Sequence, residues 1–272
     1  MGGFAFAAGR AIVAGVVTGI SAMNTEIVKS VGRVLEVLEL FQRRREALNA
    51  TDICAELNYP RSSANALLKS MVTLGYLSFD LQSMRYFPSL RVTKLGDWIP
   101  GMLFGGEAMN ILEQLHGETR ETVTLSMQNG LSMQFITVLP GTFPISLTVS
   151  EGFLAPLFGT AVGTALLSTF SDKRIEKLIK RAKKERVSVR GTSLETVRRE
   201  VEEARERGYA LAYERILPDT GAIAMPLPAV VEEQTLVVGV GGLSGRIKES
   251  QERIIQKMTR AIGRYASARA VA

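Results

Sequence analysis

The stretch TDICAELNYPRSSANALLKSMVTLGYLSFDLQSMRYF, residues 51–87, decides the fold of the first part of this chain. Its first seven residues have helical spacing, and the pair Asn58-Tyr59 breaks that pattern. Pro60 suits the first turn of the following helix, because a first turn does not need the amide hydrogen that proline lacks. We expect this helix to run from about Pro60 to Thr73 and to form a helix-turn-helix with the helix before it.

An amphipathic helix is predicted upstream of this stretch, from about Val28 to the charged run at 43–46. Its apolar residues fall on or near one stripe and comprise Val31, Val34, Leu35, Leu38, Leu40 and Phe41. Such a stripe is expected to face the core of the domain. Either Asn49 or Thr51 can cap the second helix, because both side chains accept a hydrogen bond from an unpaired amide.

A hairpin is predicted directly after the third helix. Gly75 stops the helix, and residues 76–80 and 84–87 have strand character on either side of a short turn. Two strands joined to a helix-turn-helix make a winged helix. Arg85 lies in this hairpin, where it is placed to reach a backbone phosphate or the adjacent minor groove.

The third helix has one apolar side and one basic side. Its apolar residues, which should face the first two helices, are Ala64, Leu67, Leu68, Met71 and Leu74. The other side has no carboxylate and carries Arg61, Ser62, Ser63, Asn65 and Lys69. Arg and Asn can read base edges in the major groove, while Ser and Lys can bind phosphates. We therefore predict that these five residues contact duplex DNA, together with Thr51 and Arg85. A basic face that is merely solvated is the alternative.

The composition is that of an ordinary globular protein. Of 272 residues, 46% are hydrophobic and 22% are charged, which excludes a disordered or collagen-like chain. The net charge of +6 fits a polyanionic partner without requiring one. With one cysteine, Cys54, and one histidine, His116, the sequence excludes a zinc finger, a disulfide framework and a cysteine-rich iron–sulfur site within one chain. We expect Cys54 in the core, His116 at a helix C-terminus capped by Gly117, and no cofactor.

Residues 1–22 form a leader that is rich in Gly, Ala and Val. Its apolar run after Arg10 is shorter than the roughly 20 residues that a membrane-spanning helix needs. We predict a disordered extension or a misassigned start, with Met23 as the functional start. A secretory signal and a lipid-surface anchor are the alternatives.

The rest of the chain is predicted to form a linker and a second domain. We assign residues 23–88 to the winged helix, 89–106 to the linker and 107–272 to the second domain. In the second domain, strands are expected near 122–127, 132–139, 145–149, 210–213, 221–227 and 236–242, and helices near 107–115, 161–170, 173–184, 194–207 and 250–266. Asn129-Gly130 between the first two strands is a strong hairpin signal.

Several stretches resemble those of the IclR-type transcriptional regulators. In the first domain they are SVGRVLEVLELF (30–41), AELNYPRSS (55–63) and LGYL (74–77). In the second domain they are PLFGTAVGTALL (156–167), GAIAMP (221–226) and VVGVGG (237–242). The resemblance extends from about residue 27 to the C-terminus.

This resemblance implies an α+β protein in which a helical linker joins an N-terminal winged helix-turn-helix domain to a C-terminal α/β effector-binding domain. The effector-binding domain is expected to have a curved antiparallel sheet of the GAF/profilin-like type. The third helix is then the recognition helix, and a homodimer or homotetramer places two winged helices on a pseudo-palindromic operator of double-stranded DNA. The family resemblance further implies a cytoplasmic regulator, with no membrane partner, that controls a catabolic operon in response to a small-molecule effector. Whether it represses or activates transcription stays open.

The effector pocket implied by the resemblance lies at the strand-to-helix turn of residues 160–163, whose amides and positive dipole end could hold a carboxylate. Its predicted residues are Met127, Phe158, Thr160, Ala161, Val162, Gly163, Ala222, Ile223, Gly239 and Gly241. Where small-acid binders of the family tend to have Asp, Cys and Ser, this chain has Ala212, Ala222, Gly239 and Gly241. Because such small apolar positions leave volume, we expect a larger, more apolar effector such as an aromatic or alicyclic acid, with Met127, Phe158 and Ile223 as walls. Close packing of Gly and Ala against the sheet is the alternative.

The sequence shows no motif for catalysis. A Ser-His-Asp arrangement would have to use His116, for which no nucleophile elbow exists. The glycine-rich run at 239–242 lacks the context of a dinucleotide site, and there is no P-loop. We therefore predict a protein that is not an enzyme. The competing hypothesis is a small-molecule-binding protein or enzyme whose winged helix serves protein–protein contacts.

Overall fold

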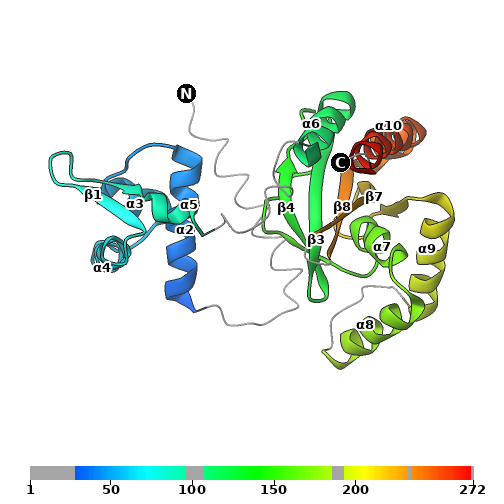
Figure 1. Ribbon diagram of the computed structural model, residues 1–272, viewed down its shortest axis with the longest axis horizontal. Helices are drawn as coiled ribbons and strands as arrows, with labels where there is room; N and C mark the ends of the chain where they lie inside the picture. Colours follow the sequence, from blue (N-terminus) through cyan, green and yellow to red (C-terminus); the bar gives the residue numbers. More distant parts are fainter. Residues whose placement is uncertain (1–27, 96–106, 186–192, 232–233, 271–272) are drawn as a thin grey trace. The chain divides into compact units, whose positions relative to one another are not determined.

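The computed structural model describes residues 28–95, 107–185, 193–231 and 234–270. These residues fall into two compact units, one containing 28–95 and the other 107–270 (Figure 1). The predicted leader at 1–22 and residues 96–106 of the predicted linker lie outside the described residues.

The N-terminal unit is a winged helix-turn-helix, which confirms the predicted fold of this part of the chain. Its elements are, in order, α2 (Lys29–Arg44), α3 (Ala50–Leu57), α4 (Arg61–Thr73), β1 (Leu77–Asp80), β2 (Arg85–Pro88) and α5 (Leu90–Thr93). β1 and β2 pair as an antiparallel hairpin. The turn between them is held by Asp80, whose carboxylate accepts hydrogen bonds from the hydroxyl and amide of Ser83 and from the amide of Gln82. These hydrogen bonds lower the pKa of Asp80.

The two helices of the helix-turn-helix have the N-termini that the sequence indicates. Asn49 caps α3, because its side chain accepts a hydrogen bond from the Asp52 amide while the Asp52 carboxylate accepts one from the Asn49 amide. This reciprocal pair is a capping box, with Asp52 in place of the more usual Glu at the third helical position. Pro60 is the N-cap of α4, one residue before the first helical position at which we expected it.

The core of the N-terminal unit lies between the second half of α2, the helices α3 and α4, and the hairpin. Its buried side chains are Val37, Leu40, Phe41, Leu48, Ile53, Leu68, Met71 and Leu77. The predicted stripe of α2 is wrong at its start, because Val31 and Leu35 are 54% and 53% exposed and Val37 is buried instead. Leu74 is also exposed, since it follows the last turn of α4 instead of facing the first two helices. Cys54 is buried, as expected.

α5, at the start of the predicted linker, is attached to the winged helix. The Ser89 hydroxyl donates a hydrogen bond of 2.5 Å to the carbonyl of Gly75. The Arg91 guanidinium donates one of 3.1 Å to the carbonyl of Leu74 and lies over the ring of Tyr76. Residues 89–93 therefore continue the N-terminal unit.

The C-terminal unit is built on a six-stranded antiparallel sheet with the strand order β5-β4-β3-β8-β7-β6. Its elements are α6 (Glu107–Thr119), β3 (Thr122–Asn129), β4 (Ser132–Leu139), β5 (Leu154–Pro156), α7 (Ala161–Ser168), α8 (Asp172–Lys184), α9 (Leu194–Arg207), β6 (Ala210–Tyr213), β7 (Thr220–Val231), β8 (Gln234–Leu243) and α10 (Ser244–Ala270). The curled antiparallel sheet confirms the predicted α/β architecture of this part of the chain.

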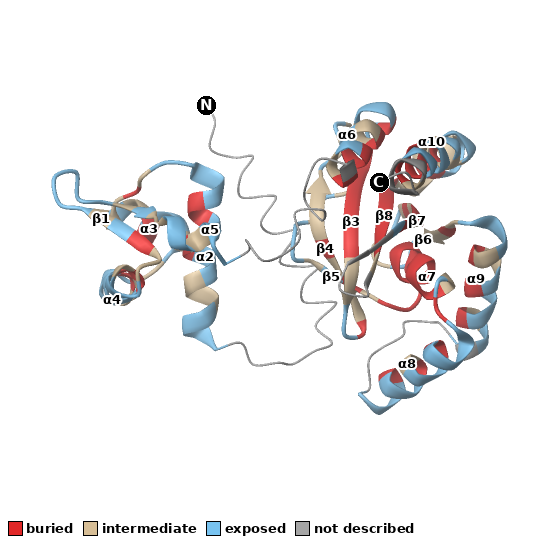
Figure 2. Cartoon of the chain, viewed as in Figure 1, coloured by how far each residue is buried: buried red, intermediate tan, exposed pale blue. Residues whose placement is uncertain are grey.

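The sheet has helices on both faces. α6 and α10 cover one face, and α7 packs on the other with α9 beside it (Figure 1). The first seven residues of α7 are all buried, which fits its sequence AVGTALLS without a charge (Figure 2). In contrast, α8 buries only Ile175, Ile179 and Ala182 and exposes most of its other residues.

Three local predictions for this unit are wrong. Residues 145–149 form no strand; the edge strand is β5, and the segment before it crosses the sheet as a loop. α10 begins at Ser244, six residues before the predicted start. α6 continues to Thr119, so Gly117 does not cap it, and the His116 ring instead makes a hydrogen bond of 2.8 Å with the Pro140 carbonyl.

An ion pair joins the start of β3 to the start of α10. Both carboxylate oxygens of Glu121 accept hydrogen bonds from Arg246, at 2.7 and 2.8 Å, and the Glu121 side chain is 5% exposed. These bonds raise the pKa of Arg246. Gly242 lies against the Glu121 carboxylate. A Cβ atom at residue 242 would lie 2.2 Å from a Glu121 oxygen, so this position requires glycine.

Among the helices of the described residues, none has the length and apolar character needed to cross a membrane.

Candidate nucleic-acid interface and ligand cavity

The predicted recognition helix, α4, presents its basic side to solvent. Arg61, Ser62, Asn65 and Lys69 are exposed, whereas Ala64, Leu68 and Met71 on the opposite side are buried. α4 contains no carboxylate, and Arg61 and Lys69 take part in no ion pair within the described residues. The helix therefore offers two cations and several hydrogen-bonding side chains to an external partner.

Ser63 differs from its neighbours because it is half-buried and already bonded. Its hydroxyl accepts a hydrogen bond of 3.3 Å from Arg33 of α2 and donates one to the Pro60 carbonyl. The same Arg33 guanidinium lies 5.0 Å from the centroid of the Tyr59 ring, and the Tyr59 hydroxyl donates to Glu36. Burial and this hydrogen bond raise the pKa of Tyr59 to about 12. Ser63 thus helps to fix the turn between α3 and α4, and less of it is available to DNA than we expected.

The remaining predicted DNA contacts lie on α3 and in the wing. Thr51 is exposed in the first turn of α3. Arg85 is exposed on β2, but one of its guanidinium nitrogens donates a hydrogen bond of 2.8 Å to the Ala47 carbonyl. A bridge between Leu48 and Tyr86 holds the wing at the same place. Arg85 therefore anchors the wing to the segment before α3 and keeps its other donors free for a phosphate.

Glu56, the carboxylate of α3 that is nearest in sequence to the turn before α4, is paired with an arginine. Arg44, at the end of α2, forms ion pairs with Glu46 at 2.6 Å and with Glu56 of α3 at 2.5 Å. These pairs, above all the hydrogen bond that Arg44 donates to Glu46, raise the pKa of Arg44.

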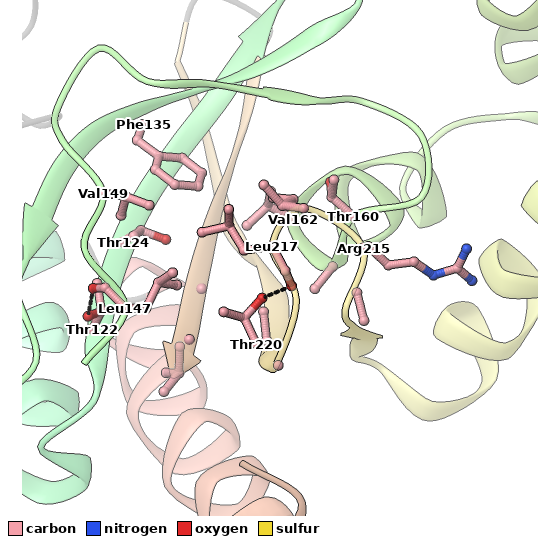
Figure 3. A pocket seen from close by; sticks show the side chains of 18 residues that line it. Thr122, Thr124, Phe135, Leu147, Val149, Thr160, Val162, Arg215, Leu217 and Thr220 are labelled. Atoms are coloured by element: carbon pink, nitrogen blue, oxygen red, sulfur yellow. Dashed lines mark hydrogen bonds between the residues drawn. The ribbon is translucent and has the colours of Figure 1, made fainter. Parts of the chain in front are cut away.

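The C-terminal unit has a cavity of ≈ 70 Å³ between the sheet, the start of α7 and the two loops that precede β5 and β7 (Figure 3). Six of the ten predicted effector residues line it, namely Thr160, Ala161, Val162, Ala222, Gly239 and Gly241. Ala212, which we singled out as a small apolar position, also lines it. The strand-to-helix turn and the glycine-rich strand therefore come together at one cavity.

Four predicted effector residues do not line this cavity, and the geometry shows why. Side chains alternate between the two faces of a strand, so Ile223 points away from the face on which its neighbour Ala222 lies, and Met127 lies on the face opposite Thr124. Phe158 is 5% exposed within the core cluster under α7. Gly163 packs so tightly that a Cβ atom would lie 1.9 Å from the Leu157 carbonyl oxygen.

Sequence reasoning missed the residues that complete the cavity. They are Thr122 and Thr124 of β3, Phe135 of β4, Leu147, Val149, Arg215, Ile216 and Leu217 of the loops, Thr220 and Gly221 of β7, and Val240 of β8. The one signal in the sequence is the alternation of Thr122 and Thr124 with Val123 and Leu125 in β3, and the structure buries both threonines, at 0% and 6% exposed. The loop residues follow no periodic pattern and gave none.

Most polar groups of the cavity are already bonded within the protein. The Thr122 hydroxyl donates to the Leu147 carbonyl at 2.6 Å, and the Thr220 hydroxyl donates to the Leu217 carbonyl at 2.7 Å. Arg215 forms an ion pair of 2.6 Å with Glu200, and Figure 3 shows its guanidinium pointing away from the cavity.

The hydroxyl of Thr124 is the exception. It makes no hydrogen bond within the described residues, although the side chain is buried, and Figure 3 shows its oxygen facing the cavity. A buried hydroxyl without a partner is costly, so this group favours a bound water or ligand.

The start of α7 supplies the other polar element. The Thr160 hydroxyl accepts a hydrogen bond from the Gly163 amide and donates one to the Pro156 carbonyl. Thr160 thereby satisfies one of the amides that we expected to hold a carboxylate. The amides of Ala161 and Val162 lie in the same first turn, where a helix has no acceptor of its own for them.

Gly239 and Gly241 do not simply leave volume, contrary to our expectation. A Cβ atom on Gly239 would lie 2.7 Å from the Thr124 hydroxyl oxygen and 3.1 Å from Val162, and one on Gly241 would lie 2.9 Å from Leu147. The glycines let these side chains approach the sheet. Val162, Leu147 and their neighbours fill part of the space beside these glycines. Because these side chains are apolar, the cavity is apolar as well.

The comparisons with known proteins agree with this architecture. The bacterial transcriptional regulator IclR C-terminal domain matches residues 105–268, and the IclR helix-turn-helix domain matches residues 30–81. The HTH-type transcriptional regulator XynR of Escherichia coli is 22% identical over 83% of this chain and 90% of its own length. The regulator KipR of Bacillus subtilis is 24% identical over 82% of this chain and 89% of its own.

Solved structures show the same fold. The IclR of Thermotoga maritima covers 88% of this chain and 99% of its own, with a TM-score of 0.57 and 19% identity. An IclR transcriptional regulator of Alicyclobacillus acidocaldarius covers 89% and 98%, with a TM-score of 0.57 and 21% identity. Because the C-terminal match alone spans more than half of the sequence, this chain belongs to the IclR family of bacterial DNA-binding transcriptional regulators.

Proposed function

We propose that this regulator binds a pseudo-palindromic operator through α4 and that a small organic acid in the cavity of the C-terminal unit changes its affinity for that operator. The observation that carries the proposal is the exposed side of α4, which has no carboxylate and has two cations without an ion pair among the residues that the structure describes. Thr51, Ser62, Ser63, Asn65 and Arg85 complete the proposed contact surface. Two copies of the chain at least are needed for the two half-sites, so a homodimer or homotetramer in the cytoplasm is part of the proposal.

The cavity supports a ligand with a large apolar part. Its walls are mostly aliphatic or aromatic, Arg215 points away, and Thr124 offers a hydroxyl that has no partner in the described part of the chain. A carboxylate can accept hydrogen bonds from this hydroxyl and from the first amides of α7. We therefore propose an aromatic or alicyclic acid. The Pca regulon regulatory protein of Pseudomonas putida, 22% identical over 84% of this chain, is named as the regulator of a regulon, which agrees with control of a catabolic operon here.

The DNA part of the proposal is tested by fluorescence anisotropy with the intergenic DNA upstream of the coding region and with random duplexes of equal length. Arg61→Ala should weaken binding to the specific site by about 1 to 3 kcal/mol if Arg61 reads a base, and should affect random DNA much less. Lys69→Ala should weaken both DNAs alike and reduce the slope of log Kd against log salt by about 1.

Lys29→Ala is the matched control, since Lys29 is an exposed cation of the same unit at the start of α2. Equal losses on specific and random DNA for Arg61→Ala would show that Arg61 binds only phosphate. No binding of the unaltered protein to either DNA would favour the competing interpretation, in which the winged helix serves protein contacts.

The ligand part is tested by thermal unfolding in the presence of benzoate-like and cyclohexane carboxylic acids, with glyoxylate as the small, polar comparison. A ligand at one hundred times its Kd stabilises the folded state by about 2.7 kcal/mol, which is easily seen as a shift in Tm. We expect shifts with the larger acids. Shifts with glyoxylate alone would overturn the proposed ligand class without affecting the DNA-binding proposal.

A further inference from the structure

α8 (Asp172–Lys184) carries the densest positive charge among the helices of the C-terminal unit that the structure describes in full. Its sequence DKRIEKLIKRAKK has seven Lys or Arg residues and two acidic residues. The helix packs on the unit through Ile175, Ile179 and Ala182, which are 3%, 8% and 2% exposed. This charge belongs neither to the winged helix nor to the ligand cavity.

Four lysines of α8 form one ridge, which we call the lysine ridge and define as Lys173, Lys177, Lys180 and Lys184. Their spacing of four, three and four residues places them on a single face of a helix. All four are exposed, and helical spacing places them on the side opposite the buried Ile175 and Ile179. At 1.5 Å of rise per residue the ridge is about 16 Å long.

The carboxylates around α8 are already paired with arginines. Asp172 binds Arg205 of α9 at 2.9 Å, and Glu176 binds Arg198 of α9 at 2.6 Å. A third carboxylate, Glu185 at the C-terminal end of α8, binds Arg181 at 2.6 Å. No lysine of the ridge has an ion pair or side-chain hydrogen bond within the described residues. The ridge is therefore left with four uncompensated positive charges.

We propose that the lysine ridge binds the phosphate backbone of duplex DNA, as a second DNA contact outside the winged helix. Neighbouring lysines of the ridge are separated by about 4.5 to 6 Å along the helix axis. Each strand of B-DNA presents one phosphate per 3.4 Å of its axis, so each lysine can meet a different phosphate. Such contacts add affinity and position the protein, and they carry no sequence information.

Two other classes of partner fit the ridge less well. A basic amphipathic helix binds a lipid surface by inserting its apolar face, but the apolar face of α8 is buried in the core of its own unit. Protein–protein interfaces are depleted of lysine relative to the rest of the surface. Lysine is, in contrast, a common phosphate ligand, and the winged helix of the same chain already holds DNA at a high effective concentration.

The test uses the full chain and a 60-base-pair duplex of random sequence. In one variant the four ridge lysines are replaced by Gln (K173Q/K177Q/K180Q/K184Q), and Kd is measured by anisotropy from low to high salt. The slope of log Kd against log salt falls by about 0.9 for each phosphate contact that is lost. We expect the slope to fall by about 2 to 4 and the affinity at low salt to fall at least tenfold, with an unchanged Tm.

The control removes four exposed cations from another helix of the same unit, as K248Q/R253Q/R260Q/R264Q in α10. This variant has the same net charge as the ridge variant, so it controls for the loss of overall charge, and its Tm reports the loss of the contacts of Lys248 with Tyr213 and of Arg264 with Gln114. A slope in the ridge variant equal to that of the control, or to that of the unaltered chain, would overturn the proposal. Because α4 is intact in both variants, specific binding by the winged helix is retained and the two DNA contacts are separated.

Discussion

A glycine at residue 239 shapes the cavity of the C-terminal unit. Gly239 lies on β8 opposite Thr124 of β3, and the two positions are paired in the sheet. The missing side chain at Gly239 is what allows the Thr124 hydroxyl and Val162 to come close to the strand. The cavity is thus defined as much by a glycine as by the side chains that line it.

Gly239→Ala should destabilise the protein. Its Cβ atom would lie 2.7 Å from the Thr124 oxygen, and crowding of this kind costs about 1 to 3 kcal/mol. Urea unfolding measures the change. Gly245→Ala in the first turn of α10 is the matched control, since no atom lies within 4 Å of its Cβ position, and it should leave stability unchanged or raise it by up to about 1 kcal/mol. Equal stability of the two variants would show that the strand shifts freely.

Thr124→Val tests the unpartnered hydroxyl. The substitution keeps the shape of the side chain and removes a buried polar group that has no partner within the described residues, so the ligand-free protein should be as stable or more stable. Affinity for an acid in the cavity should fall by about 0.5 to 1.5 kcal/mol. Thr220→Val, which removes a hydroxyl bonded to Leu217, should instead lower stability. Isothermal titration and thermal unfolding separate the two effects, and unchanged ligand affinity in Thr124→Val would place the acid elsewhere.

At the scale of elements, local chemistry could be predicted from the sequence and contacts between distant segments could not. The helices and the hairpin of the winged helix follow from spacing, from Asn49 as a cap and from Pro60 as a starter, all of which act within a few residues. Val31 and Leu35 have the right spacing but lie beyond the part of α2 that the rest of the unit covers. Periodicity shows which residues share a face, whereas the length of that face that becomes buried depends on tertiary packing.

The cavity likewise shows that local sequence does not predict contacts between distant segments. The start of α7 and the glycines of β8 could be placed there because their stretches resemble those of the IclR-type effector domain. Ile223 was assigned to the wrong face, since it neighbours Ala222 in the sequence but points to the other side of the sheet. Leu147 and Leu217 reach the cavity from irregular loops, and no local pattern in the sequence connects a loop to a particular strand.

The hydrogen bonds that hold the turn of the wing should depend on pH. Hydrogen bonds from Ser83 and Gln82 lower the pKa of Asp80 in the folded state. A carboxyl group of this kind stabilises the fold above its unfolded pKa, and that contribution is lost as the pH falls through the lower, folded pKa. We expect the amide signals of Gln82 and Ser83 to shift in an NMR titration at a pH below the ordinary pKa of an aspartate. Asp80→Asn should abolish this titration, and a midpoint at or above the ordinary value of an aspartate would contradict the geometry.

At the scale of the whole molecule, the proposed regulation is a linkage between two binding equilibria. If an acid in the cavity changes operator affinity by some factor, operator DNA must change the affinity for the acid by the same factor. We expect a factor of about 5 to 150, the usual range for such coupling. Titrating each ligand at saturating concentrations of the other measures both factors. Unequal factors would show that the acid acts through a different equilibrium, such as aggregation.

The pair between Glu121 and Arg246 has a consequence for synthesis of the chain on the ribosome. Domains fold as units during translation, with the N-terminal one first. The winged helix is complete by about residue 95, whereas the C-terminal unit lacks the counter-ion of a buried carboxylate until residue 246 has been made. A nascent chain that stalls between these points carries a folded winged helix and an incomplete C-terminal unit. Premature termination is therefore expected to yield a fragment in which only the winged helix is folded.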